Sequence, residues 1–148
     1  MTTWEAVMSA VGLALGGDRE GGRSALLACW RETGDAEQAQ QCVVAHYIAD
    51  LEDRLNDEVA WDERALLAYK HVGREDLAAV GIPDAAGLAP SLHLNLGDGY
   101  LRQGRPSEAL VQWEAALDVQ HVLGDDGYAN MIRNGLAALE AKLNALTG

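Results

Sequence analysis

Phenylalanine is absent from this 148-residue sequence, and cysteine occurs only as Cys29 and Cys42. Without Phe, Trp and Leu must fill the bulky core positions. Hydrophobic residues make up 49% of the sequence, which is ordinary for a folded protein. Two cysteines without a secretory signal indicate reduced thiols. We therefore expect both to be small core residues and not a redox pair.

Basic residues are also scarce, with 11 Lys and Arg against 23 Asp and Glu, which gives a formal net charge of -12. Such an acidic surface repels the phosphates of nucleic acids and the headgroups of anionic lipids. We therefore expect neither a nucleic acid nor a membrane as a partner.

The sequence lacks long apolar runs, and no basic stretch follows Met1. A membrane-spanning helix needs about 20 predominantly apolar residues, and a secretory signal needs a basic and then an apolar region. We expect neither, and we expect the protein to be cytoplasmic. The length predicts one domain over residues 1–148, with a sizeable core.

The residues that are present indicate helices, most clearly between positions 90 and 123. Apolar and small residues recur there every three or four positions, namely Leu92, Leu96, Tyr100, Ala109, Trp113, Ala116 and Leu117. Gly104 can end a helix in a left-handed conformation, and Pro106 can open the next one because its missing N–H is no loss there. Alternation around Leu94 would also suit a strand, but the continued spacing favours two helices.

This stretch resembles the tetratricopeptide repeat, a helix–turn–helix unit of about 34 residues. The matching residues are Leu96, Gly97 and Tyr100 in the first helix and Ala109, Trp113 and Ala116 in the second. His93 stands where Trp is usual, and His121 where Pro is usual. The resemblance implies antiparallel helix hairpins that stack into a binding scaffold, with Gly97 allowing two helices to approach closely.

The rest of the chain divides at glycines and at Asp or Asn into further helices. We predict hairpins at residues 3–33 and 35–73, an insertion at 74–89 and a last helix at 128–146. The expected fold is all-α, with the hairpins stacked as a short superhelix similar to tetratricopeptide repeat proteins. The last helix would cap the terminal face of the stack.

Local patterns refine the two ends of the chain. Thr2 and Glu5 fit a capping box, and Gly21-Gly22 would open the second helix. The first helix has one apolar stripe made of Trp4, Met8, Val11 and Leu15. The last helix has another, made of Ile132, Leu136, Leu139, Leu143 and Leu146. This second stripe suits a cap, and the same spacing would suit a homodimer seam.

Few residues suggest chemistry. His46 and Asp50 share one face of a helix, but two ligands are fewer than the three or four protein ligands of zinc sites. The acidic run 50–64 is interpreted as solvated surface and a turn, with a site for a basic partner as the alternative. The stretch 124–127 resembles a calcium loop in two residues only. We expect no catalytic group, metal or cofactor.

The resemblance also implies where a partner binds, because the first helix of each hairpin lines a concave groove in that family. Carried onto this sequence, the groove residues are Leu13, His46, Asp50, Asn95, Asp98 and Arg102. Family members that bind a peptide carboxyl terminus use Lys, Arg and Asn there, and no lysine is among these six. Since Asp50 and Asp98 are present, a basic or neutral peptide is expected.

The resulting hypothesis is a protein interaction scaffold or adaptor that binds a peptide or a partner protein in this groove and is not an enzyme. A second hypothesis is a helical bundle that binds a metal or a small ligand, or catalyses a reaction. It rests on His46, Asp50 and His93 converging on a pocket. Stoichiometric metal, or a strong thermal shift with a small molecule, would favour it.

Overall fold

A computed structural model describes residues 2–147, and within that range the chain is helical with no β-strand. The prediction of an all-α fold is confirmed, and the strand alternative around Leu94 is wrong, because this residue lies inside a helix. No helix of the described range is both long enough and apolar enough to cross a membrane. The chain divides into two compact units, Met1–Ala85 (unit 1) and Ala86–Gly148 (unit 2). That they act as a single domain stays a prediction.

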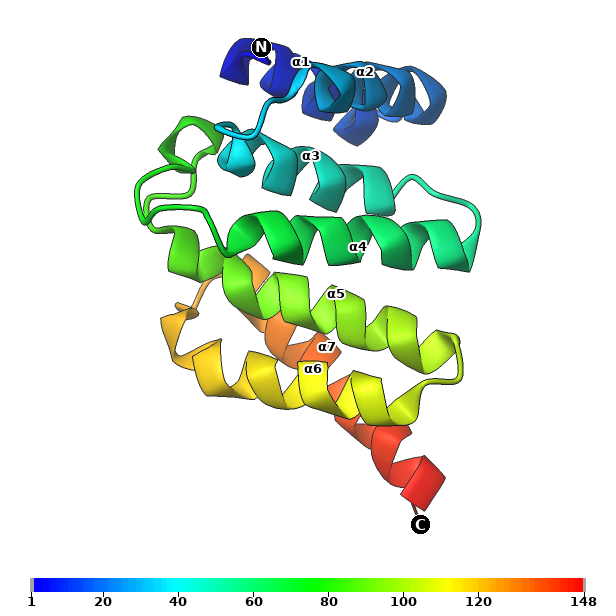
Figure 1. The fold of residues 1–148 in the computed structure, drawn as a ribbon. Coiled ribbons are helices and arrows are strands. Elements are labelled where there is room, and N and C mark those ends of the chain that lie inside the picture. Colours follow the sequence, from blue (N-terminus) through cyan, green and yellow to red (C-terminus); the bar gives the residue numbers. More distant parts are fainter. Residues whose placement is uncertain (1, 148) are drawn as a thin grey trace. The chain divides into compact units, whose positions relative to one another are not determined.

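Unit 1 consists of two antiparallel helix hairpins and a short irregular segment. Its helices are α1 (Trp4–Leu15), α2 (Arg19–Glu32), α3 (Gln38–Ala49) and α4 (Leu55–Tyr69). The helices pair as α1 with α2 and α3 with α4, and α2 also packs against α3 (Figure 1). Leu26, Val44, Ile48 and Val59 are among its most deeply buried side chains. α3 is buried on more than one face, because its consecutive residues 42–45 are all buried.

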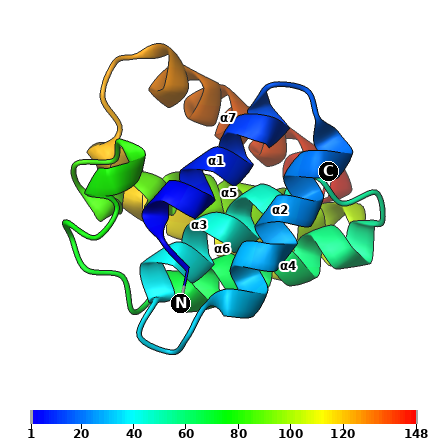
Figure 2. The same cartoon turned by 90° about the horizontal axis from the view of Figure 1, so that it is seen from above.

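A glycine sets how closely the first hairpin packs. A β-carbon added at Gly22 would lie 2.8 Å from backbone and side-chain atoms of Ala14, so Gly22 permits a close approach of α2 to α1. Figure 2 shows these two helices packed against each other. The prediction that this helix begins at Gly21-Gly22 is wrong. Asp18 accepts a hydrogen bond from the backbone N of Gly21 at 2.9 Å, and this cap begins α2 at Arg19.

The start of α1 also differs from its prediction. Thr3 caps the helix by accepting from the backbone N of Ala6 at 3.1 Å, so the capping box proposed for Thr2 and Glu5 is wrong. Thr2 is instead buried and donates from Oγ1 to the carbonyl oxygen of Cys29 at 2.6 Å. This bond ties the start of the described chain to the end of α2.

The buried face of α1 matches the predicted stripe only in part. Val7, Ala10 and Val11 are buried, whereas Met8 is 44% exposed and Leu15 73% exposed. Of the predicted stripe, Val11 is buried and Trp4 is half-buried, so the buried face overlaps the prediction at one side only. The small side chains match the close approach at Gly22 and leave the larger ones outside.

The insertion predicted at 74–89 is short, and a hydrogen bond ties it to α4. It holds two 3-10 helices, η1 (Ala78–Val80) and η2 (Ala85–Leu88). Leu77 is fully buried, and Tyr69 donates from its hydroxyl to the carbonyl oxygen of Ala85 at 2.9 Å. Arg74 pairs with Asp84 at 2.9 Å. These contacts hold the segment at both ends.

Unit 2 is a helix hairpin covered by one further helix. Its elements are α5 (Ala89–Arg102), α6 (Pro106–Val119), η3 (Gln120–Val122) and α7 (Gly127–Thr147). α5 and α6 are antiparallel (Figure 1). Gly104 has a φ of 76° in the turn between them, and Pro106 is the first residue of α6. Both predicted roles are confirmed.

Gly97 lies where the three helices of unit 2 meet. A β-carbon there would be 3.3 Å from Cβ of Gln112, 3.4 Å from the carbonyl oxygen of Ala109 and 3.1 Å from Cδ2 of Leu139. Ala109 itself is fully buried. The prediction that Gly97 permits close helix packing is confirmed, and its neighbours include α7 as well as α6.

α7 packs its apolar stripe against its own unit. Its residues Ile132 and Leu136 form a buried cluster with Ala116, and Trp113 donates from Nε1 to the carbonyl oxygen of Leu136 at 3.2 Å. Leu139 and Leu143 are also buried, whereas Leu146 is 62% exposed. The stripe thus covers the hairpin, and a homodimer through this helix, which stays a prediction, would have to use its other faces.

Candidate functional site

The six residues predicted to line a groove belong to both units. Leu13 lies on α1, and His46 and Asp50 lie on or just after α3 in unit 1. Asn95, Asp98 and Arg102 lie on α5 in unit 2. Each set is therefore described within its own unit, and one groove lined by all six stays a prediction.

Asp98 and Arg102 contact each other on α5. They are one helical turn apart, with Arg102 Nε 2.9 Å from Asp98 Oδ2. Their side chains are 44% exposed for Arg102 and 36% for Asp98, and an exposed pair at this spacing stabilises a helix by only about 0.3–0.5 kcal/mol. This pair therefore contributes little to the fold and remains at a partly exposed surface.

α7 adds a residue to this surface that the sequence did not assign to it. Lys142 Nζ lies 3.9 Å from the other carboxylate oxygen of Asp98, and its side chain is 61% exposed. The groove was predicted from the first helices of hairpins, so α7 was treated only as a cap. A signal was present, because Lys142 lies next to the buried Leu143 and three residues after the buried Leu139.

These three charged residues belong to a pocket of about 580 Å³. It is lined by Asp98, Leu101, Arg102, Gly104, Pro106, Lys142 and Leu146. The lining comes from the end of α5, the turn after it, the start of α6 and the last turns of α7, all within unit 2. Apolar side chains from three elements therefore meet two cations and one carboxylate.

The other predicted residues on α5 do not line this pocket. Asn95 is half-buried. His93, which replaces the usual Trp, places its Nδ1 2.8 Å from Oε1 of Gln112 on α6. It thus joins the two helices through a polar contact, with the tautomer protonated at Nδ1 as the donor.

In unit 1, His46 and Asp50 lie one turn apart. Nδ1 of His46 is buried and has no hydrogen-bond partner among the described residues, and its ring meets that of Tyr47 edge-on at 5.4 Å. Burial lowers the pKa of His46, and the charge of Asp50 partly offsets this. Loss of hydration raises the pKa of Asp50, and His46 partly offsets that. Leu13 is 43% exposed on α1.

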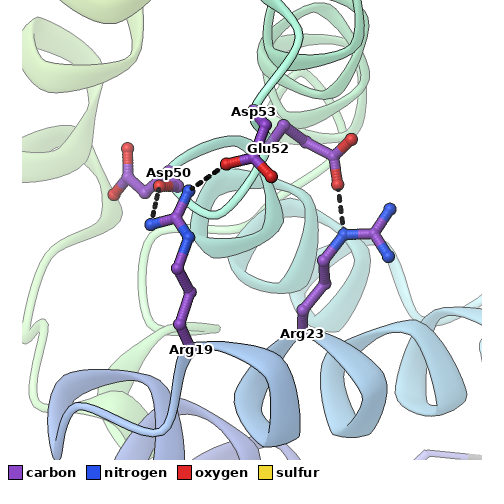
Figure 3. Close-up of polar contacts among 5 residues, drawn as sticks. All are labelled: Arg19, Arg23, Asp50, Glu52 and Asp53. Atoms are coloured by element: carbon purple, nitrogen blue, oxygen red, sulfur yellow. Dashed lines mark hydrogen bonds and ion pairs between the residues drawn. The ribbon is translucent and has the colours of Figure 1, made fainter.

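Two arginines of α2 partly neutralise the acidic run after α3. Arg23 Nε lies 2.6 Å from Glu52 Oε1, and Glu52 has a side chain only 5% exposed. Arg19 donates to Asp53 Oδ1 at 3.3 Å and to the backbone carbonyl of Asp50 at 3.4 Å. Figure 3 shows the carboxylate of Asp50 pointing away from both arginines. Two acids of the run thus hold the α3–α4 loop against α2.

The remaining candidate groups have structural surroundings. Asp126, in the stretch that resembles a calcium loop, accepts from the backbone N of Ala129 at 2.8 Å and caps α7. Cys29 and Cys42 are buried and unbridged, and burial raises the pKa of Cys42 to about 12. No three His, Cys, Asp or Glu side chains within residues 2–147 cluster as a metal site would require. Convergence of His46, Asp50 and His93 would join the two units and stays a prediction.

The pocket of unit 2 is therefore the best-supported candidate site of the described chain. Searches against protein-family models, curated proteins and solved structures found no match to this chain.

Proposed function

We propose that this chain is a protein interaction module, similar to tetratricopeptide repeat proteins, that binds a peptide segment of a partner protein in the pocket of unit 2. The observation that carries this proposal is the pocket itself, because two residues chosen from the sequence as partner contacts, Asp98 and Arg102, both line it. No covalent bond is made or broken in this function.

The lining suits a short segment with one large apolar side chain. Leu101, Pro106 and Leu146 supply apolar surface, and Leu146 is 62% exposed in the absence of a partner. Burial of a Leu-sized side chain contributes about 1.5–3 kcal/mol. A dissociation constant of 1 mM corresponds to about 4.1 kcal/mol. The charged residues of the lining, Asp98, Arg102 and Lys142, which form the rim, therefore have to supplement the apolar contact.

The charges of the rim bear on the partner. Asp98 faces Arg102 and Lys142, so two cations surround one carboxylate. The expectation of a basic or neutral peptide rested on Asp50 and Asp98 and did not include Lys142. These charges therefore disfavour a basic segment.

The test compares two charge-reversed variants of the full chain in affinity capture from the native host. Asp98→Lys with Arg102→Glu alters the pocket, whereas Arg74→Glu with Asp84→Lys reverses an ion pair of unit 1. Circular dichroism checks that both retain their helicity. We expect a specific partner to be lost with the first variant and retained with the second.

A captured protein that is lost with the first variant counts as a partner only if a peptide from it shifts the backbone amide signals of Leu101, Lys142 and Leu146 in NMR spectra of the parent chain. Equal capture by both variants would argue against the pocket. No described contact favours the metal-binding or enzymatic hypothesis over this one.

A further inference from the structure

The pocket of unit 2 is locally cationic in a chain whose formal net charge is -12. Arg102 and Lys142 are the two cations of the lining, and Asp98 is its one carboxylate. Repulsion from the acidic surface as a whole disfavours acidic ligands at long range. Within about 10 Å, the Debye length at 0.1 M salt, the local cations decide which ligand charge is preferred.

The two cations differ in how Asp98 holds them. Arg102 Nε is 2.9 Å from Asp98, which is a hydrogen bond, whereas Lys142 Nζ is 3.9 Å away and lies beyond hydrogen-bond distance. An ammonium group has three donors, and the Lys142 side chain is 61% exposed. Lys142 can therefore donate to the carboxylate of a ligand while the Asp98–Arg102 pair on α5 stays intact.

Lys142 also has an apolar neighbour in the pocket. Leu146 follows it by one helical turn, so the two side chains project from the same face of α7, about 6 Å apart along the axis. In an extended peptide, residues two positions apart point to the same side and are separated by about 6.8 Å. An apolar residue and an acidic residue at that spacing match Leu146 and Lys142.

We infer that the pocket binds an extended segment in which a Leu-, Ile- or Met-sized side chain and an Asp or Glu lie two residues apart. The carboxylate pairs with Lys142, and the apolar side chain covers Leu101, Pro106 and Leu146. This inference rests on the proposed function and names the chemical class of its partner. In this inference α7 contacts the peptide through Lys142 and Leu146 and also covers the α5–α6 hairpin.

The probes are acetylated and amidated heptapeptides of Gly and Ser that carry one Leu and, two residues later, Glu, Gln or Lys. Binding to the full ¹⁵N-labelled chain is followed by NMR at low salt. We expect the Glu peptide to shift the amide signals around the pocket and to bind about two- to fivefold more tightly than the Gln peptide, as an exposed ion pair permits. The Lys peptide should bind most weakly, and added salt at about 0.5 M should remove the preference.

Two substitutions of lysine separate the ion pair from the apolar contact. Lys142→Gln should remove the difference between the Glu and Gln peptides while leaving Leu-dependent binding. Lys70→Gln, at the other lysine of the chain and exposed in unit 1, should leave the difference intact. Leu146→Ser should weaken all three peptides alike.

The outcomes distinguish this inference from the proposed function. Equal or tighter binding of the Lys peptide would overturn the acidic partner and leave the peptide pocket standing. If no peptide shifts these amide signals at millimolar concentration, both proposals fail. If the same signals shift with protein concentration alone, the pocket binds a second copy of the chain, and the peptide assignment is wrong.

Discussion

Gly22 on α2 faces Ala14 on α1 so closely that a β-carbon at Gly22 would lie 2.8 Å from the backbone of Ala14. The first hairpin can pack at this distance only because glycine has no side chain. Helix propensity alone would favour alanine there by about 1 kcal/mol. The position therefore separates the effect of helix packing from the effect of propensity.

Gly22→Ala should lower the free energy of unfolding by about 1–3 kcal/mol, because overpacking at a backbone contact outweighs the gain in propensity. Chemical denaturation measures the change. Gly12→Ala is the matched control, since Gly12 is in the interior of α1 and an added β-carbon would have no atom within 4 Å beyond its chain neighbours and the backbone of its own helix. It should raise stability by about 0.5–1 kcal/mol. A stabilising Gly22→Ala would mean that the hairpin opens freely at this point.

The two arginines that hold the α3–α4 loop should differ in importance. Arg23→Gln leaves the carboxylate of Glu52, only 5% exposed, without its ion-pair partner, and the cost should be about 1–3 kcal/mol. Arg19→Gln removes a partner of Asp53, which is 93% exposed, and should cost at most about 1 kcal/mol. Urea denaturation of both variants measures the difference. Equal losses would contradict the importance of burial at Glu52.

Trp113→Phe tests the attachment of α7. The substitution keeps an aromatic ring against Ile132 and Leu136 but removes the bond from Nε1 to the carbonyl oxygen of Leu136. Loss of one such bond costs about 0.5–1.5 kcal/mol. We expect a lower melting temperature with unchanged helical content at 25 °C. An unchanged melting temperature would show that this hydrogen bond does not help to hold α7.

Stability should depend on His46 at mildly acidic pH. Because burial lowers the pKa of His46 in the folded state, the unfolded state binds more protons just below the ordinary His pKa of about 6.5. The contribution of His46 is complete above that pH and is lost as the pH falls toward the lowered folded pKa. Asp50, whose pKa is raised, opposes this at lower pH, because its protonation favours the folded state.

The measurement is the free energy of unfolding at several pH values between 5 and 8. His46→Gln should flatten the fall in stability below about pH 6.5. His71→Gln is the control, since His71 is an exposed histidine just after α4 in the same unit, and it should leave the pH dependence as in the parent chain. If the free energy of unfolding of His46→Gln falls with decreasing pH as steeply as that of the parent chain, His46 is not the cause of the pH dependence.

Local signals in the sequence located most of the elements. Apolar spacing predicted the helices of the hairpins, and Gly104 and Pro106 marked the turn between α5 and α6 because their backbone preferences act within a few residues. Gly97 was recognised as a point of close packing from its place in a repeat-like pattern. Each of these signals depends on neighbours in sequence or on regular periodicity.

The sequence by itself determined an all-α chain and the approximate bounds of its helices. Tertiary structure alone decided that Val7 and Ala10 of α1 are buried while Met8 is exposed, and that Lys142 reaches Asp98 from a helix far along the chain. The physical reason is that periodicity specifies which side chains share a face of a helix. Which face is covered, and by what, depends on the packing of segments that are distant in sequence.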